Sequence, residues 1–286
     1  HSFPTRRFPI SGDFGTVTMG DTDGALDWAM QEASIGNPGS IRDDETSHAG
    51  FFGSYHDDAG AYDGQIVRYD HSLGGCSFAV SVEQNDAGSA GNGETDTAVF
   101  DGMAMLADTI DDNVGVNLAL GLKYDLDLGG TTVGLGGGFQ TLDANALILA
   151  GAIPTAGDAA AAAVDETVNI FAISADVALD NGLVAALQFT SGDIGGVEDS
   201  THIGVGVGYS VDNFSIHANY GQFSIGDTFV GGGEGAADNS PSGFGLAASY
   251  DLGGGLSAHF GYGSSDLDTG DDDTFSTYSI GFAMSF

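Results

Sequence analysis

Apolar and polar residues alternate along much of this chain, and the pattern is clearest at its C-terminal end. There, every second position carries a large apolar side chain, and the positions between carry small or polar ones. The apolar positions are Tyr278, Ile280, Phe282, Met284 and Phe286. Because successive side chains of a β-strand point to opposite faces, this segment is predicted to form a strand with one aromatic-rich apolar face and one small or polar face.

The same alternation recurs at residues 114–126, 203–209, 244–252 and 256–262. We count about thirteen such runs, the first at residues 6–11 and the last at residues 274–286. Short connections fall at residues 11–14, 71–75, 127–130, 180–182, 211–213 and 252–255. Long connections rich in Gly, Asp, Asn and Ser alternate with them, at residues 21–63, 85–113, 143–166, 191–201, 224–242 and 265–273. One rim of tight hairpins and one rim of long loops is typical of a transmembrane antiparallel β-barrel.

Composition supports a folded chain built from strands. Hydrophobic residues make up 42% of the chain and include 18 Phe and 9 Tyr, which supplies far more burial than a disordered chain carries. The 48 Gly residues favour turns and strands, and no run approaches the roughly 18 consecutive apolar residues of a membrane helix. Any membrane crossing is therefore predicted to be made by strands.

The charge balance is strongly acidic and excludes several functions. The chain has 41 acidic and 5 basic residues and a formal net charge of -36. Such a chain repels nucleic-acid phosphates, so a nucleic-acid partner is excluded. Neither a G-x-S-x-G elbow nor an H-E-x-x-H helix is present, so no catalytic residues are assigned and the protein is not expected to be an enzyme.

Residues 11–29 read S-G-D-F-G-T-V-T-M-G-D-T-D-G-A-L-D-W-A, and Gly12 to Gly20 fit the pattern G-D-F-G-T-x-x-x-G. Together with a closing strand that ends in Phe286, this segment resembles general diffusion porins of the outer membrane, of the Rhodobacter-like type found in photosynthetic α-proteobacteria. The resemblance covers residues 11–286, with the loops matching only in character. It implies that residues 1–286 form a single all-β barrel domain, with 16 strands in the complete protein. It also implies a homotrimer, contact with lipopolysaccharide, and passive diffusion of ions and small hydrophilic solutes through a water-filled lumen.

In that family the third loop folds into the barrel and narrows the pore, and residues 21–63 correspond to it. Because the run at residues 15–21 resembles a strand well inside the barrel, we expect the opening strands to be missing from this sequence. Residues 1–10 carry Pro4, Pro9 and the basic pair Arg6–Arg7, and are a candidate junction or sequence scar.

The constriction loop is predicted to be acidic. Its acidic residues are Asp21, Asp23, Asp27, Glu32, Asp43, Asp44, Glu45, Asp57, Asp58 and Asp63, and Arg42 is its only base. Carboxylates in a pore with low-dielectric walls favour cations over anions, so the loop predicts a cation-preferring channel. For any one of these residues the alternative is a solvated surface position.

Two bases are predicted on the barrel wall. Lys123 lies between Leu122 and Tyr124, and Arg68 lies between Val67 and Tyr69. The flanking residues belong to the apolar face, and neighbouring residues of a strand point to opposite faces. Arg68 and Lys123 are therefore predicted on the lumen side. These bases either oppose the acidic loop or neutralise neighbouring carboxylates such as those of Asp70 and Asp125.

Tyrosines precede several of the short turns, where a barrel rim would meet lipid headgroups. They are Tyr69, Tyr124, Tyr209 and Tyr250. This placement predicts an aromatic girdle, and the alternative is a set of core-facing tyrosines in a soluble β-sandwich.

No cofactor is required, but a structural Ca²⁺ ion at the loop carboxylates is a candidate, with its ligands unassigned. His48, His56 and Asp57 could bind a transition metal, although such residues in a Gly-rich loop are more often unliganded. Two alternatives to a pore remain open: a secreted or surface Gly/Asp-rich calcium-binding β-protein, and a barrel adhesin.

Overall fold

The computed structural model describes residues 8–42, 45–51, 65–84, 116–143, 167–194, 200–224, 240–268 and 274–285. These residues form one antiparallel sheet of thirteen strands, each paired with its neighbours in the sequence. The strands are β1 (Phe8–Gly12), β2 (Gly15–Asp21), β3 (Gln65–Leu73), β4 (Cys76–Gln84), β5 (Val116–Asp127), β6 (Thr131–Asp143), β7 (Thr167–Leu179), β8 (Leu183–Ile194), β9 (Ser200–Val211), β10 (Phe214–Ser224), β11 (Ser242–Gly253), β12 (Leu256–Asp266) and β13 (Thr274–Met284). The predicted all-β antiparallel fold and the count of thirteen strands are confirmed.

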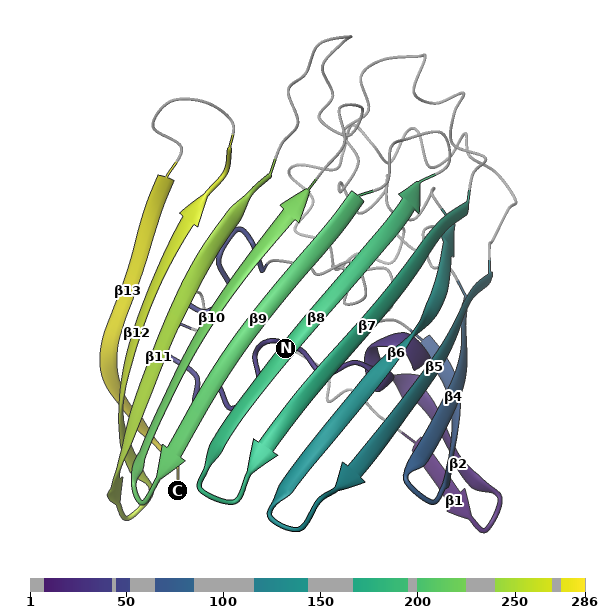
Figure 1. Cartoon of the computed structure of the whole chain (residues 1–286), viewed down its shortest axis with the longest axis horizontal. Helices are drawn as coiled ribbons and strands as arrows, with labels where there is room; N and C mark the ends of the chain where they lie inside the picture. The colour runs from purple at the N-terminus through teal and green to yellow at the C-terminus, as the bar shows by residue number, and fades with distance from the viewer. Residues whose placement is uncertain are drawn as a thin grey trace, which may run out of the picture.

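The sheet is curved, and its tilted strands surround the segment that follows β2 (Figure 1). In the described part of the chain, β1 pairs only with β2 and β13 pairs only with β12, so the sheet has two edges and is not closed. Residues 8–10 of the candidate junction belong to β1 and pair with Met19, Thr18 and Val17 of β2. The expected total of about 16 strands stays a prediction.

The short turns lie together at one rim of the sheet, at the bottom of Figure 1. The turn between β7 and β8 shows why glycine is used there. Gly182 has a φ of +89°, in the left-handed region that side chains rarely adopt, and a Cβ at this position would overlap the carbonyl oxygen of Ser210. The turn therefore needs a residue without a side chain.

The two faces of the sheet have inverted polarity compared with a soluble domain. Outward-facing apolar side chains are exposed, for example Leu120 at 57% and Ile280 at 79%. Inward-facing polar side chains are buried, including those of Gln140 and Gln188. A soluble β-sandwich buries its apolar face, so this arrangement favours a sheet whose outer surface meets lipid.

The segment inside the curve begins with one short helix, α1 (Ala25–Ala29), which the sequence pattern did not predict. Ala25 and Leu26 of α1 pack against the inner faces of the neighbouring strands, in a small apolar cluster with Ile66 and Ala119. Among the described residues, no helix has both the length and the apolar character needed to span a membrane.

Candidate functional site

The segment that we call the inner loop, residues 21–42 and 45–51, runs along the inside of the sheet. Several of its backbone N–H groups donate hydrogen bonds to polar side chains of the wall. These bonds join Ala25 N to Ser81 Oγ (2.8 Å), Gln31 N to Ser174 Oγ (2.9 Å), Ala33 N to Gln188 Oε1 (2.7 Å) and Ala49 N to Ser265 Oγ (3.0 Å). The acceptors lie on β4, β7, β8 and β12, so the loop is attached across most of the sheet.

Carbonyl oxygens of the inner loop are bound by the wall in the same way. The wall side chain donates in each of these bonds, which run from Arg68 to Asp23 O (2.7 Å), Lys123 to Trp28 O (3.1 Å), His217 to Ile35 O (2.9 Å), His259 to Gly39 O (3.2 Å), Asn219 to Thr46 O (3.0 Å) and His202 to Gly50 O (2.8 Å). Because buried backbone groups must be paired, these side chains compensate for the absence of regular secondary structure in most of the loop.

Glycines on the wall allow the loop backbone to come this close. A Cβ added at Gly121 would overlap the carbonyl oxygen of Ala25, and one at Gly206 would overlap that of Ala33. Any larger residue at either position would push the inner loop away from the sheet. The glycines of the inner face therefore set the path of the loop.

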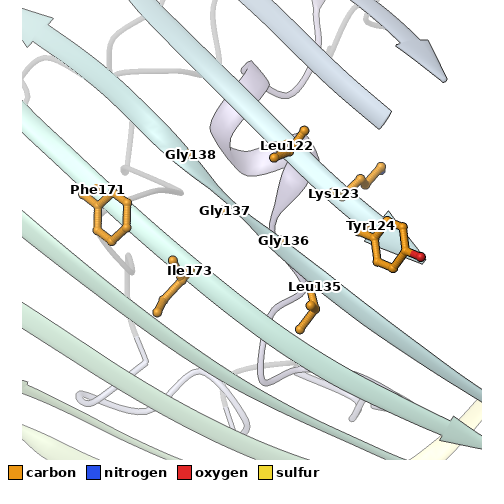
Figure 2. Close-up of a pocket in the computed structure, with 9 residues that line it drawn as sticks. All are labelled: Leu122, Lys123, Tyr124, Leu135, Gly136, Gly137, Gly138, Phe171 and Ile173. Atoms are coloured by element: carbon orange, nitrogen blue, oxygen red, sulfur yellow. The ribbon is translucent and has the colours of Figure 1, made fainter. Parts of the chain in front are cut away.

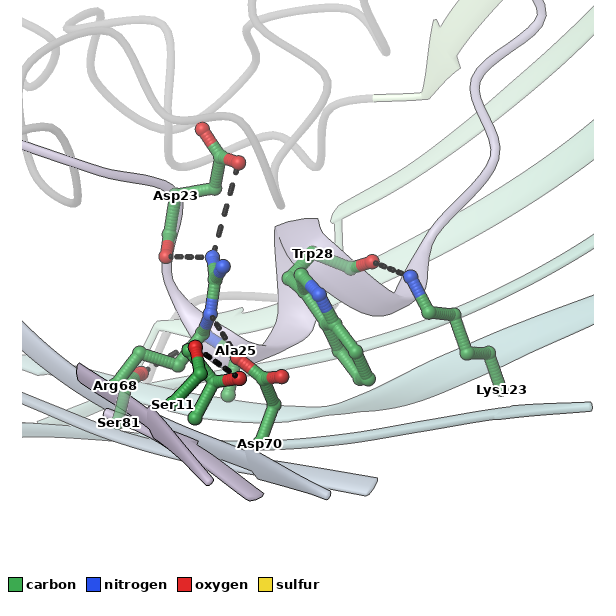
Figure 3. A network of polar contacts seen from close by, with 9 residues as sticks. Ser11, Asp23, Ala25, Trp28, Arg68, Asp70, Ser81 and Lys123 are labelled. Atoms are coloured by element: carbon green, nitrogen blue, oxygen red, sulfur yellow. Dashed lines mark hydrogen bonds and ion pairs between the residues drawn. The ribbon is translucent and has the colours of Figure 1, made fainter. Parts of the chain in front are cut away.

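The two predicted wall bases both lie on the inner face, at the start of the loop (Figure 3). Arg68 is 8% exposed, and its guanidinium lies 3.7 Å from a carboxylate oxygen of Asp23 and 3.5 Å from one of Asp70. Lys123 Nζ lies 3.7 Å from the centre of the Trp28 ring. Arg68 thus combines the two roles considered from the sequence, since it pairs with Asp23 of the loop and with Asp70 of its own strand.

The predicted acidic residues have different environments. Asp23, Asp27 and Glu32 are partly exposed inside the curve of the sheet, and Arg42 is exposed. Asp43, Asp44, Asp57, Asp58 and Asp63 lie outside the described residues, and only the backbone of Asp21, in β2, is described. Three of the predicted carboxylates are therefore placed where dissolved ions could approach them.

Glu45 differs from the expectation of a pore-lining carboxylate, because its side chain is fully buried. Ser40 donates a hydrogen bond to Oε2 of Glu45, and a Cβ at Gly263 would overlap the carbonyl oxygen of Glu45. Burial by itself raises the pKa of the Glu45 carboxyl, but the hydrogen bond from Ser40, the nearby Ser279 hydroxyl and the charge of Arg42 outweigh it and hold the pKa below its usual value. Glu45 is thus an ionised anchor of the loop against β12.

His48 of the loop is also buried against the wall. Its Nε2–H donates a hydrogen bond to Oδ1 of Asn219 (3.1 Å), and Nδ1 has no partner among the described residues. His56 and Asp57, considered with it as metal ligands, lie outside the described residues. Within the described ranges, no group of three or more His, Cys, Asp or Glu side chains could hold a metal ion.

The residues predicted for the lipid interface lie on the outer face. Tyr69, Tyr124, Tyr209 and Tyr250 occupy the ends of β3, β5, β9 and β11 that adjoin the short-turn rim. In β13 the side chains of Tyr278, Ile280, Phe282 and Met284 are all exposed, by 63% to 79%, and Phe286 lies outside the described residues. Their role as a girdle and as a lipid-facing strand stays a prediction.

A groove of about 440 Å³ crosses the outer face over β5, β6 and β7, where Gly137 leaves a gap between larger apolar side chains (Figure 2). Leu122, Leu135, Phe171 and Ile173 line it. Because these side chains lie on the outer face, the groove belongs to the apolar outer surface and is separate from the channel interior.

A curved antiparallel sheet with an apolar outer face, a polar inner face and a loop attached inside it defines an outer-membrane β-barrel of the porin class. Residues 6–272 match the family model for Gram-negative porins, so the chain belongs to the Gram-negative porin family. It is an outer-membrane porin channel. Comparison with curated proteins gives no significant match.

Solved structures with the same fold have low sequence identity. A porin refined at 1.8 Å resolution is 20% identical, with a TM-score of 0.52, over 98% of this chain and 80% of that one. The anion-selective porin from Comamonas acidovorans is 14% identical, with a TM-score of 0.55, over 99% of this chain and 78% of that one. The trimer form of OmpT from Vibrio cholerae is 12% identical, with a TM-score of 0.53, over 96% of this chain and 77% of that one. At these identities the likeness shows the fold alone.

Proposed function

We propose that this porin forms a water-filled, cation-preferring channel for the passive diffusion of ions and small hydrophilic solutes. The observation that carries the proposal is the unequal exposure of charge inside the sheet. Asp23, Asp27 and Glu32 are partly exposed. Of the three bases described on the loop and the wall only Arg42 is exposed, because Arg68 is buried between carboxylates and Lys123 is bonded to the loop. Permeating ions therefore meet carboxylates more readily than bases.

The physical basis is the field of fixed charges in a narrow aqueous space. Low-dielectric walls weaken the screening of each carboxylate, so cations are concentrated and anions are depleted near the loop. The whole chain, with 41 acidic and 5 basic residues, adds a field of the same sign. No covalent chemistry is involved in this function.

Three finer features belong to the same proposal. The motif of residues 11–29 supports a porin of the Rhodobacter-like type, and that resemblance also implies contact with lipopolysaccharide. The trimer form of the Vibrio cholerae OmpT structure supports a homotrimer. A structural Ca²⁺ ion at the loop carboxylates, which are hard oxygen ligands, belongs to the same proposal, with its ligands unassigned. The family match favours a channel over a secreted calcium-binding protein or an adhesin.

The test is the single-channel conductance and zero-current potential of the full-length protein in a planar bilayer under a KCl gradient. We expect stepwise conductance and a potential of cation-selective sign, reduced in Asp27→Asn and Glu32→Gln variants. Thr132→Ser, at an exposed site on β6 near the short-turn rim, is the matched control and should behave like the wild type. A potential of anion-selective sign would overturn the cation preference, and folded protein without conductance would overturn the channel.

A further inference from the structure

One aromatic ring inside the sheet contacts both wall bases. The ammonium of Lys123 lies 3.7 Å from the centre of the Trp28 ring, and the guanidinium carbon of Arg68 lies 5.7 Å from it (Figure 3). Lys123 Nζ also donates a hydrogen bond to the carbonyl oxygen of Trp28 (3.1 Å). The lysine is therefore held by the ring and by the backbone of the same residue.

Helix α1 fixes the ring in this position. Trp28 N donates to Gly24 O (2.9 Å) within the helix, and Ala25 N donates to Ser81 Oγ of β4 (2.8 Å). The helix lies so close to β5 that a Cβ at Gly121 would overlap the Ala25 carbonyl oxygen. Trp28 also packs against the apolar cluster around Leu26, so its indole cannot move away without displacing the helix.

The two bases differ in their contacts with carboxylates. Arg68 has carboxylate oxygens of Asp23 and Asp70 within 4 Å, whereas no carboxylate of the described residues lies within ion-pair distance of Lys123. Lys123 is thus attracted by the carboxylates of Asp125, Asp70 and Asp23 only from beyond contact distance. A half-buried ammonium that is covered by an indole and bonded to a carbonyl oxygen is, however, less open to contact by a dissolved anion.

We propose that Trp28 is a specificity-determining residue of the channel, because it covers the Lys123 ammonium and keeps permeating anions from pairing with it. The inference rests on the proposed cation preference and assigns part of it to an uncharged residue. The acidic loop supplies the attraction for cations, and Trp28 keeps the adjacent base from offering a site to anions.

A double-mutant cycle tests the proposal with four proteins: wild type, Trp28→Ala, Lys123→Met and Trp28→Ala/Lys123→Met. Zero-current potentials give the cation-to-anion permeability ratio of each. We expect Trp28→Ala to lower this ratio by roughly twofold or more when Lys123 is present. In the Lys123→Met background the same substitution should leave the ratio unchanged, although it widens the pore and raises conductance in both backgrounds.

A Trp28→Phe variant keeps an aromatic face over Lys123 and serves as the conservative control, with a ratio close to that of the wild type. This variant also tests the proposal if Trp28→Ala fails to fold. An equal change of the ratio in both lysine backgrounds, or no change in either, would overturn the role of Trp28. The sign of the wild-type potential separately tests the proposed cation preference, so the two failures are distinguishable.

Discussion

At the scale of single residues, His48 connects the inner loop to the wall as a neutral imidazole. It is 2% exposed, and it faces Asn219 of β10, His202 of β9 and Phe51 of the loop. Burial lowers the pKa of His48 to about 4, since the hydrogen bond to Asn219 only partly offsets it and the neighbouring His202 lowers it further. The attached loop therefore binds fewer protons than a released loop would.

This difference predicts that the C-terminal half of the loop detaches more readily in acid. In a released loop the pKa of His48 returns to about 6.5. The equilibrium constant for attachment is therefore highest above that pH. It falls as the pH is lowered toward about 4, by up to roughly tenfold per pH unit. Hydrogen exchange of residues 45–51, corrected for the intrinsic effect of pH, measures this opening. A His48→Gln variant keeps a polar group but cannot titrate, so its opening should change less with pH. An identical pH dependence in both proteins would contradict the assignment to His48.

At the scale of elements, the contact between the inner loop and β9 depends on Gly206. A Cβ at this position would overlap the carbonyl oxygen of Ala33, and Ala33 N donates a 2.7 Å hydrogen bond to Gln188 of the adjacent strand β8. Displacing the loop at this point therefore also breaks a buried hydrogen bond. The inner loop and the wall are therefore closely packed at this point.

A Gly206→Val substitution is accordingly expected to move the loop off the wall and to destabilise the protein by about 1–3 kcal/mol. Single-channel conductance should rise and fluctuate, and thermal unfolding should begin at a lower temperature. Val207→Ala changes the next residue of β9, which faces outward, and is the matched control with near wild-type conductance. If Gly206→Val conducts like the wild type, the inner loop does not limit the pore at β9.

The alternation of side chains was sufficient to predict the strands, the short turns and the faces on which Leu122 and Lys123 lie, because a period of two is a local property of a strand. It did not predict α1, since five residues are too few to establish a helical period. Nor did it identify Ser174, Gln188 or His217 as partners of the loop backbone. Those contacts depend on how the loop crosses several strands, which no local pattern encodes, although inward polar positions beside glycines are a usable signal.

At the scale of the whole molecule, the apolar outer face and polar inner face place the inner loop against polar side chains of the wall, which bind its backbone on several strands. Lipid contact requires the outside to be apolar, so charged side chains of the wall such as Arg68, Asp70 and Lys123 face the interior, and the chain as a whole is strongly acidic. Selectivity in such a channel is expected to depend on the summed field of many carboxylates as well as on individual contacts.

A field effect predicts that cation preference weakens as salt is raised. The screening length falls from about 10 Å at 0.1 M to about 3 Å at 1 M, which is shorter than the half-width of a pore that passes small solutes. Zero-current potentials measured at a constant KCl ratio should therefore decline toward zero as both concentrations increase. Glu32→Gln should lower the potential at low salt and change it little at high salt, because only the unscreened field reaches across the lumen. A preference that stays constant with salt would instead assign selection to direct contact of ions with carboxylates in a narrow passage.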